Sequence, residues 1–152
     1  MPFFVDTSPP GQCIFCRLVS KEIPASIVFE DDQTLAFMDL GQVNPGHVLV
    51  ASKRHAATLL DLSADEAAAV MRTAHRVAQA ISATFDPPGL TLLQANGQEG
   101  EQTVFHFHMH VVPRHAHDGI ALTWPRKEPP REVLQAHAQR LIQALQANRL
   151  SA

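Results

Sequence analysis

A run of alternating histidines and large apolar residues at positions 104–114 constrains this chain more than any other feature. The histidines are His106, His108 and His110, and they alternate with Phe105, Phe107 and Met109. Because successive side chains of a strand point to opposite faces, the run predicts a strand with imidazoles on one face and apolar side chains in a core. A row of imidazoles is costly to bury and is rarely needed for packing. The run therefore indicates a metal site, a phosphate site or a nucleophile.

The overall composition limits the kind of protein that can carry such a site. At 152 residues, the chain is long enough for one domain with a substantial core. It has no apolar run of membrane-spanning length, and residues 1–11 do not resemble a secretory signal, so we expect a cytoplasmic protein with no membrane partner. The net charge is −3 and the basic residues are scattered, which argues against binding to long nucleic acid.

Periodicity and turn residues predict five strands and two main helices. Strands are expected at residues 26–30, 34–39, 47–52, 90–96 and 104–112. Ser63 and Glu66 form a capping box that begins a long helix. The apolar stripe of this helix consists of Ala67, Val70, Met71, Ala74, Val77, Ala78 and Ile81. A short helix is expected near residues 14–20 and a final one from about Arg131 to Ala147. The short turns between strands favour an α+β fold with an antiparallel sheet.

The only two cysteines form a C-x-x-C pair, Cys13 and Cys16. Four interpretations are open: a disulfide, a thioredoxin-like redox pair, two buried small side chains, or half of a metal site. A reducing compartment disfavours the disulfide, and a redox pair needs a βαβ setting that the predicted elements do not supply. A metal site needs two more ligands, and the chain has nine histidines to provide them.

Several motifs, taken in order along the chain, resemble the histidine-triad (HIT) family. The triad itself is followed by two apolar residues, as in the family signature. The segments that look like the N-terminal half of the family are Phe37-x-Asp39, Pro45-Gly46-His47-x-Leu49-Val50 and His55. Those that look like its active-site loop are Asn96-Gly97 and Gln102-Thr103-Val104. The C-x-x-C pair resembles the zinc-binding subset of bacterial members. The resemblance covers roughly residues 13–124, and the ordered combination is highly specific.

This resemblance implies both a fold and an activity. The fold would be α+β, a five-stranded antiparallel sheet with one long central helix and a C-terminal helix. The activity would be that of a hydrolase or nucleotidyl transferase that cleaves nucleoside phosphoramidates, adenylates or dinucleoside polyphosphates at the α-phosphate. His108 would attack phosphorus and form a covalent nucleotidyl-histidine intermediate, because a neutral imidazole is a competent nucleophile at neutral pH. Its other ring nitrogen would donate to a backbone carbonyl, and no cofactor would be needed for the chemistry.

The resemblance also implies roles for residues around the nucleophile. His110 and His47 would contact phosphate oxygens. The substrate-binding residues would be Asp39 at the ribose, Asn96 near the ribose and phosphate, Gln102 and Thr103 at the α-phosphate, and Phe37 beside the base, which is expected to be a purine. From position alone, Asp39 is equally well explained as a turn-forming residue, and core packing is the simpler explanation for apolar residues of this set.

The same resemblance sharpens the interpretation of the cysteines. The implied ligands are Cys13, Cys16, His55 and His106. They would form a closed Cys2His2 tetrahedral site, so we expect one structural zinc ion per chain. We also expect a homodimer, with Trp124 and the C-terminal segment as candidate interface elements. Residues 1–12 would be a flexible lead-in, residues 13–125 the HIT domain, and residues 126–152 a C-terminal helical extension.

Two alternatives to this enzyme remain open. Glu101 stands where the family usually has glycine, and a carboxylate there could repel a substrate phosphate or restrict the backbone. It keeps open a nucleotide- or partner-binding module with weak or vestigial catalysis. The second alternative is a hydrolase whose histidine row binds a catalytic metal. Such sites usually recruit carboxylates as well, and we expect none to be placed for it.

Overall fold

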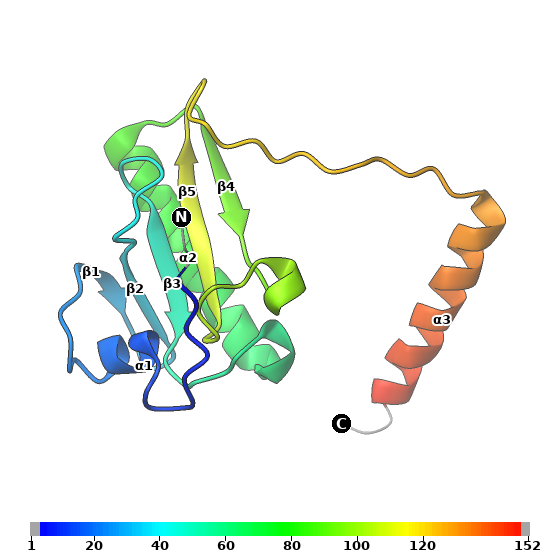
Figure 1. The fold of residues 1–152 in the computed structure, drawn as a ribbon, viewed down its shortest axis with the longest axis horizontal. Coiled ribbons are helices and arrows are strands. Elements are labelled where there is room, and N and C mark those ends of the chain that lie inside the picture. The colour runs from blue at the N-terminus through cyan, green and yellow to red at the C-terminus, as the bar shows by residue number, and fades with distance from the viewer. Residues whose placement is uncertain (1–3, 150–152) are drawn as a thin grey trace. The chain divides into compact units, whose positions relative to one another are not determined.

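The structure is a computed structural model that describes residues 4–149. The chain forms two compact units, which divide between Asp118 and Gly119. The first unit is built on a five-stranded antiparallel sheet in the order β1-β2-β3-β5-β4 (Figure 1). Its strands are β1 (Ile27–Glu30), β2 (Thr34–Met38), β3 (Val48–Ser52), β4 (Gly89–Leu93) and β5 (His108–Arg114). The predicted α+β fold with a five-stranded antiparallel sheet is confirmed.

The long helix α2 (Ala64–Phe85) covers one face of this sheet. Its N-terminus has the predicted capping box between Ser63 and Glu66. The buried stripe packs against Phe107 and sheet residues and consists of Val70, Ala74, Val77 and Ile81. The prediction for Met71 is wrong, since this side chain is 48% exposed. Thr73 is buried instead, and its hydroxyl lies 2.8 Å from that of Thr34 on β2, so a hydrogen-bonded polar pair occupies part of the interface.

A second, smaller core lies against the opposite face of the sheet. There the short helix α1 (Ile14–Val19) contributes Phe15 and Leu18, which pack on β2 and β3 residues. The register between β3 and β5 pairs Leu49 with His110 and Ala51 with His108. Leu49 and Ala51 belong to the core beneath α1, and so the strand histidines face the α1 side.

The histidine run departs from the predicted strand in its first half. Strand β5 begins at His108, whereas residues 104–107 form an irregular segment with a single parallel bridge from Val104 to Asp6. Phe107 still enters the core beneath α2, but His106 lies outside the strand ladder. The predicted strand is therefore wrong over residues 104–107, although the His106 ring still lies on the α1 side, where it contacts Cys13 and Phe15. The fourth strand also ends early, at Leu93.

The described part of the N-terminal segment is hydrogen-bonded to this irregular segment and to the residue before it. The Asp6 amide donates to the Thr103 carbonyl at 2.7 Å, and the Phe105 amide donates to the Asp6 carbonyl at 2.8 Å. The Asp6 carboxylate also accepts from the Ile14 amide at the start of α1. This attachment was not predicted. The division into lead-in, domain and extension stays a prediction.

The second unit contains the helix α3 (Arg131–Arg149), close to its predicted bounds. Its main apolar side chains are between 40% and 65% exposed, and these are Val133, Leu134, Leu141, Ile142 and Leu145. Trp124, which precedes the helix, is also exposed. Among the described residues, no helix has the length and apolar character needed to cross a membrane.

Candidate active site

Four candidate metal ligands converge where the irregular segment meets α1. The distances from Cys13 Sγ are 3.6 Å to His55 Nδ1 and 3.3 Å to His106 Nδ1. From Cys16 Sγ the corresponding distances are 3.3 and 3.5 Å. Tetrahedral zinc, with Zn–S of about 2.3 Å and Zn–N of about 2.0 Å, requires sulfur–nitrogen separations of about 3.5 Å. The predicted ligand set is therefore brought together with spacings that fit zinc, and both cysteines are free thiols, which contradicts the disulfide interpretation.

The hydrogen bonding and protonation of these ligands also suit a metal ion. His106 donates from Nε2 to the Ser52 carbonyl at 2.6 Å, which leaves Nδ1 as the bare nitrogen. Burial lowers the pKa of His106 to about 4, so its ring is neutral at neutral pH. Burial raises the pKa of the Cys13 thiol to about 11. A bound cation would reverse that shift by stabilising the thiolate.

His108 lies immediately beyond this group, at the start of β5. Its Nδ1 lies 2.7 Å from the carbonyl oxygen of His106, so Nδ1–H donates and Nε2 is left with a free lone pair. The ring is buried, and burial lowers its pKa, which the hydrogen bond to His106 partly opposes. A buried, neutral imidazole with a bare Nε2 is the state that a nucleophilic histidine needs.

His47, His110 and Asp39 form a second convergent group beside His108. His47 Nε2 lies 2.9 Å from His110 Nδ1, and the Asp39 carboxylate is 3.5 and 3.9 Å from these two nitrogens. Burial lowers the pKa of His47, and it lowers that of His110 to about 4 with help from repulsion by His108 and His47. The expectation that no carboxylate accompanies the histidines is wrong. Asp39 comes from the end of β2, which is remote in sequence, and its position depends on the β2–β3 pairing.

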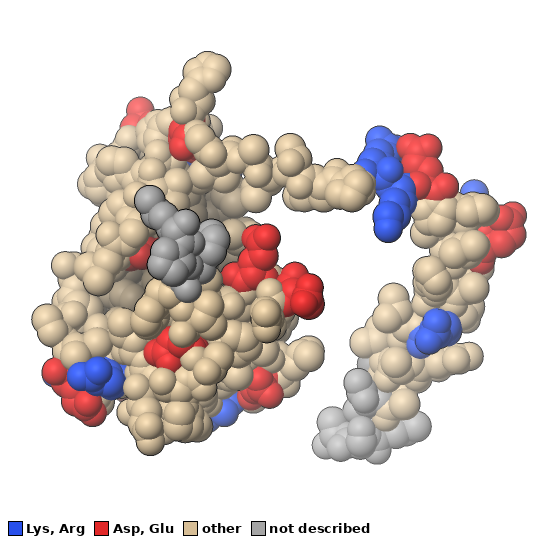
Figure 2. Space-filling view, viewed as in Figure 1, with Lys and Arg blue, Asp and Glu red and all other residues tan. Residues whose placement is uncertain are grey.

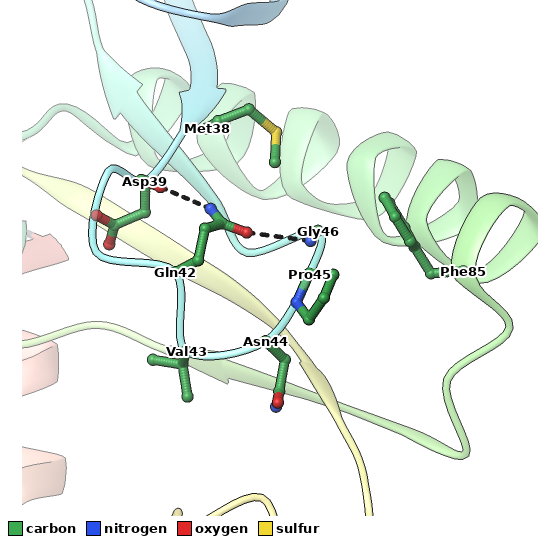
Figure 3. Close-up of a pocket in the computed structure, with 8 residues that line it drawn as sticks. All are labelled: Met38, Asp39, Gln42, Val43, Asn44, Pro45, Gly46 and Phe85. Carbon is green, nitrogen blue, oxygen red and sulfur yellow. Dashed lines mark hydrogen bonds between the residues drawn. The ribbon is translucent and has the colours of Figure 1, made fainter.

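The loop at residues 39–47, which carries Asp39 and His47, is braced by a side chain that the sequence analysis missed. Gln42 donates from Nε2 to the carbonyls of Asp39 and His47, at 2.6 and 2.7 Å. Its Oε1 accepts from the amides of Gly46 and His47, both at 3.1 Å. Figure 3 shows the bonds of Gln42 to Asp39 and to Gly46. Asp39 also accepts from the Gly41 amide, so it is a turn-forming residue and a member of the histidine group at once.

A shallow cavity of about 450 Å³ lies on the outer side of the same loop. Its lining joins the loop to the end of α2 and consists of Met38, Asp39, Gln42, Val43, Asn44, Pro45, Gly46 and Phe85 (Figure 3). Of Asp39, His47 and His110, only Asp39 lines this cavity. Gly46 has φ +95°, and a Cβ there would lie 2.8 Å from the Phe85 ring, so both the conformation and the space require glycine.

The predicted substrate-binding residues of the second loop are engaged within the protein. The Gln102 side chain is buried, accepts from the Gly97 amide and donates to the carbonyls of Ala57 and Val104. Asn96 is exposed, and its side-chain oxygen accepts from the Leu59 amide at 2.7 Å. Thr103 is half-buried. The side chain of Gln102 thus holds the loop in shape, and its role toward a substrate stays a prediction.

Two further residues bear on the expectations for this site. Glu101 has φ +64°, a left-handed conformation that glycine adopts more readily, and its side chain is exposed. Phe37 is buried in the core beneath α1, where its ring packs edge-to-face on Phe15 with centroids 5.3 Å apart. Core packing is therefore the better account of Phe37 than an open wall beside a base.

Comparisons with known proteins agree with this fold. The family model of the HIT domain matches residues 20–117. Protein hit of Bacillus subtilis is 39% identical over 113 residues, which cover 74% of this chain and 78% of that protein. The adenosine 5'-monophosphoramidase of Schizosaccharomyces pombe is 35% identical over 114 residues, covering 74% and 83%.

Two solved structures are similar over most of the chain. A HIT family protein from Bacillus anthracis has a TM-score of 0.86 at 37% identity and covers 90% of this chain and 99% of its own. A zinc-bound histidine triad family protein from Mycobacterium smegmatis has a TM-score of 0.69 at 33% identity, with coverage of 88% and 97%. Fold and site define an α+β protein with a histidine-triad site. The chain belongs to the HIT family.

Proposed function

We propose that this protein is a nucleotide hydrolase or nucleotidyl transferase that acts at the α-phosphate of its substrate through His108. The observation that carries the proposal is the hydrogen bond from His108 Nδ1 to the His106 carbonyl, which leaves Nε2 free to attack. The similarity to an adenosine 5'-monophosphoramidase favours a nucleoside phosphoramidate, with a purine nucleotide part, over adenylates and dinucleoside polyphosphates.

The reaction would proceed in two displacements at phosphorus. His108 Nε2 forms a bond to the α-phosphorus, and the bond from phosphorus to the leaving group breaks with its electron pair on the leaving amine, which takes up a proton from solvent. The positive charge on the phosphorylated ring is stabilised by the His106 carbonyl. Water then attacks the same phosphorus, the bond from phosphorus to Nε2 breaks, and one proton of the water passes to solvent, which releases the nucleoside monophosphate and restores neutral His108.

The neighbouring groups would bind the phosphate and the ribose without a formal positive charge. In the tautomer in which His47 Nδ1 accepts from the Val43 amide, at 3.4 Å, His47 donates to His110. His110 then carries its proton on Nε2 and can donate it to a phosphate oxygen. Asp39 would accept from the ribose hydroxyls, and Asn96, Gln102 and Thr103 would line the phosphate side through their loop. Phe37 would support the base only from within the core.

The group formed by Cys13, Cys16, His55 and His106 would hold one structural zinc ion. The proposal is supported by the ligand spacings, by the hydrogen bond of His106 to Ser52, and by the similarity to a zinc-bound family member. Four protein ligands leave no open position, so zinc would supply stability and no chemistry. Metal analysis of the purified protein, with one zinc per chain expected, tests this assignment.

We also infer a homodimer formed through the edge of the sheet. Strand β4 has a neighbour on one side only, and its side chains Leu90, Leu92 and Leu93 are 40–47% exposed. An exposed apolar edge strand is a common place for self-association. Light scattering gives the mass in solution, and a monomer at all concentrations would contradict the inference. The cytoplasmic location stays a prediction.

Trapping the covalent intermediate tests the proposed activity. The protein is mixed with adenosine 5'-phosphoramidate, quenched in base because a phosphorylated imidazole is labile in acid, and analysed by peptide mass spectrometry. An adenylyl group on the peptide that contains His108, together with release of AMP, is expected. Tight binding of AMP without either product would favour a nucleotide-binding module, the alternative that Glu101 keeps open.

A metal-dependent hydrolase is the second candidate, because Asp39, His47 and His110 present ligand atoms within 4.8 Å of one another. A carboxylate with two imidazoles is a common set for catalytic metals. The two candidates separate on chelation: the histidine mechanism retains activity after a chelator that leaves the structural zinc in place, and a metal-dependent one loses it.

A further inference from the structure

The nucleophile and the proposed zinc site share a residue. The ring of His106 presents Nδ1 to both cysteine sulfurs, at 3.3 and 3.5 Å. The backbone carbonyl of the same residue accepts the Nδ1–H of His108 at 2.7 Å. A displacement of His106 would therefore move a metal ligand and, with it, the group that orients the nucleophile.

Helix α1 provides a second connection between the two sites. Cys13 is its N-cap, Cys16 lies in its first turn, and Phe15 stands between them with its ring buried. The Phe15 and His108 rings meet edge-to-face, with centroids 4.9 Å and planes 85° apart. Phe15 also meets the His106 ring at 6.0 Å. The helix that carries both candidate sulfur ligands thus carries the aromatic ring that packs against the nucleophile.

The position of α1 depends on such attachments. It has six residues, and isolated helices of this length are unstable in water. Other attachments are the bond from the Ile14 amide to Asp6 and the packing of Phe15 on Phe37. The two thiols add the connection to His55 and His106, which lie in other parts of the chain.

We propose that Phe15 and His106 are positioning residues that couple occupancy of the metal site to the orientation of the His108 ring. The inference rests on the proposed function, in which zinc is structural and His108 is the nucleophile. When α1 and His106 are held together, the Phe15 ring and the His106 carbonyl fix the imidazole with Nε2 toward phosphorus. When they separate, the imidazole gains freedom to rotate and kcat falls. KM changes little, because Asp39 and His47 are held by their own loop.

The test uses the full chain and two variants that act on different parts of the connection. Cys16→Ser removes one thiolate, and Phe15→Leu removes the aromatic ring while keeping all four metal ligands. For each variant, metal content is measured together with kcat, KM and the NMR resonance of the His108 Nδ1 proton, which its hydrogen bond protects from exchange. The resonance reports on ring orientation independently of activity.

The expected results differ between the two variants. Cys16→Ser loses zinc and the His108 resonance, and its kcat falls by up to about 100-fold at nearly constant KM. Phe15→Leu keeps zinc, shifts or broadens the resonance, and loses about tenfold in kcat. Returning zinc to the chelated wild type restores both the resonance and kcat.

The matched control is Leu18→Ala, which removes another buried side chain of α1 and leaves Phe15 and the ligands in place. We expect a lower Tm with the resonance and kcat unchanged. Equal losses of kcat and of the resonance in this control would assign the effect to general loosening of α1 and overturn the coupling. Two other results would also overturn it: a zinc-free Cys16→Ser with wild-type kcat and resonance, or a wild type that contains no zinc. If the wild type does not turn over the phosphoramidate, the proposed function fails, while metal content and the resonance still decide the coupling.

Discussion

His106 and His108 are two residues apart, yet the structure surrounds them in opposite ways. Both nitrogens of His106 are engaged, Nδ1 with two sulfurs and Nε2 with the Ser52 carbonyl. Within the described residues, His108 forms a hydrogen bond through Nδ1 only, and its Nε2 has no partner. The closed group consists of His106 with Cys13, Cys16 and His55. The open group consists of His108 with His47, His110 and Asp39. The same residue type can therefore serve stability or chemistry according to how many of its nitrogens the protein engages.

The two groups also differ in their electrostatics. Neither contains Lys or Arg, and the basic residues visible in Figure 2 form no stripe on the face shown. Burial lowers the pKa of His106 in the closed group and the pKa values of His108 and His110 in the open group, so these three rings are neutral at neutral pH. In the closed group, the neutral His106 ring leaves a lone pair for a cation. In the open group, neutral rings leave a lone pair for phosphorus and N–H donors for its oxygens.

The largest expected effect separates the two groups at His108. In His108→Ala, kcat for adenosine 5'-phosphoramidate should fall by about 10⁴-fold or more, because the nucleophile is gone. Zinc content should be unchanged, because His108 supplies no metal ligand. The matched control is His75→Ala on the exposed surface of α2, and activity that survives in His108→Ala would refute the covalent mechanism.

Loss of metal from the closed group should lower the stability of the folded protein. In Cys13→Ser the free energy of unfolding is expected to fall by about 3 kcal/mol or more, with a Tm lower by roughly 10 °C, because the tether between α1 and the irregular segment is lost. Differential scanning calorimetry with and without a chelator gives the comparison. A chelator should lower the Tm of the wild type and leave that of Cys13→Ser unchanged; equal chelator effects would contradict the assigned ligands.

A substitution at Gln42 tests the open group alone, because this side chain braces the loop that holds Asp39 and His47. Gln42→Leu keeps the size of the side chain and removes four hydrogen bonds to the loop backbone. We expect kcat/KM to fall by about tenfold with zinc content unchanged. Gln139→Leu, the same substitution at an exposed position of α3, is the control. A wild-type kcat/KM in Gln42→Leu would show that the loop needs no brace.

The sequence predicts the elements of this molecule better than it predicts their junctions. The cap at Ser63 and the antiparallel sheet follow from local patterns and are confirmed. The start of β5 does not, because the amides of Phe105 and Phe107 donate to the carbonyls of Asp6 and Ala56, which are distant in sequence. Alternation therefore predicts a longer strand than the tertiary contacts allow.

The same limit applies to the site residues. The motif resemblance identifies the cysteines and histidines that converge, because those residue types are distinctive at their spacing. Gln42 and Phe15 have no such signal. An exposed glutamine and a buried phenylalanine are ordinary in composition, and their importance depends on which backbone groups or rings they meet. Asp39 shows both behaviours, since its motif is recognisable but its proximity to His110 depends on strand pairing.

The smallest effect concerns the pH dependence of the open group. Burial holds the pKa of His108 below its ordinary value of 6.5 and that of His110 at about 4. The rings thus stay neutral at neutral pH, and the acid limb of kcat/KM should lie below pH 6.5, the ordinary pKa of a histidine. The Asp39 carboxylate favours the protonated rings and so raises the pKa values of His47 and His110. Asp39→Asn should therefore move the acid limb of the pH–rate profile to lower pH, by less than about one unit, whatever its effect on the level of activity. A shift toward higher pH would show that Asp39 does not act on these imidazoles through its charge.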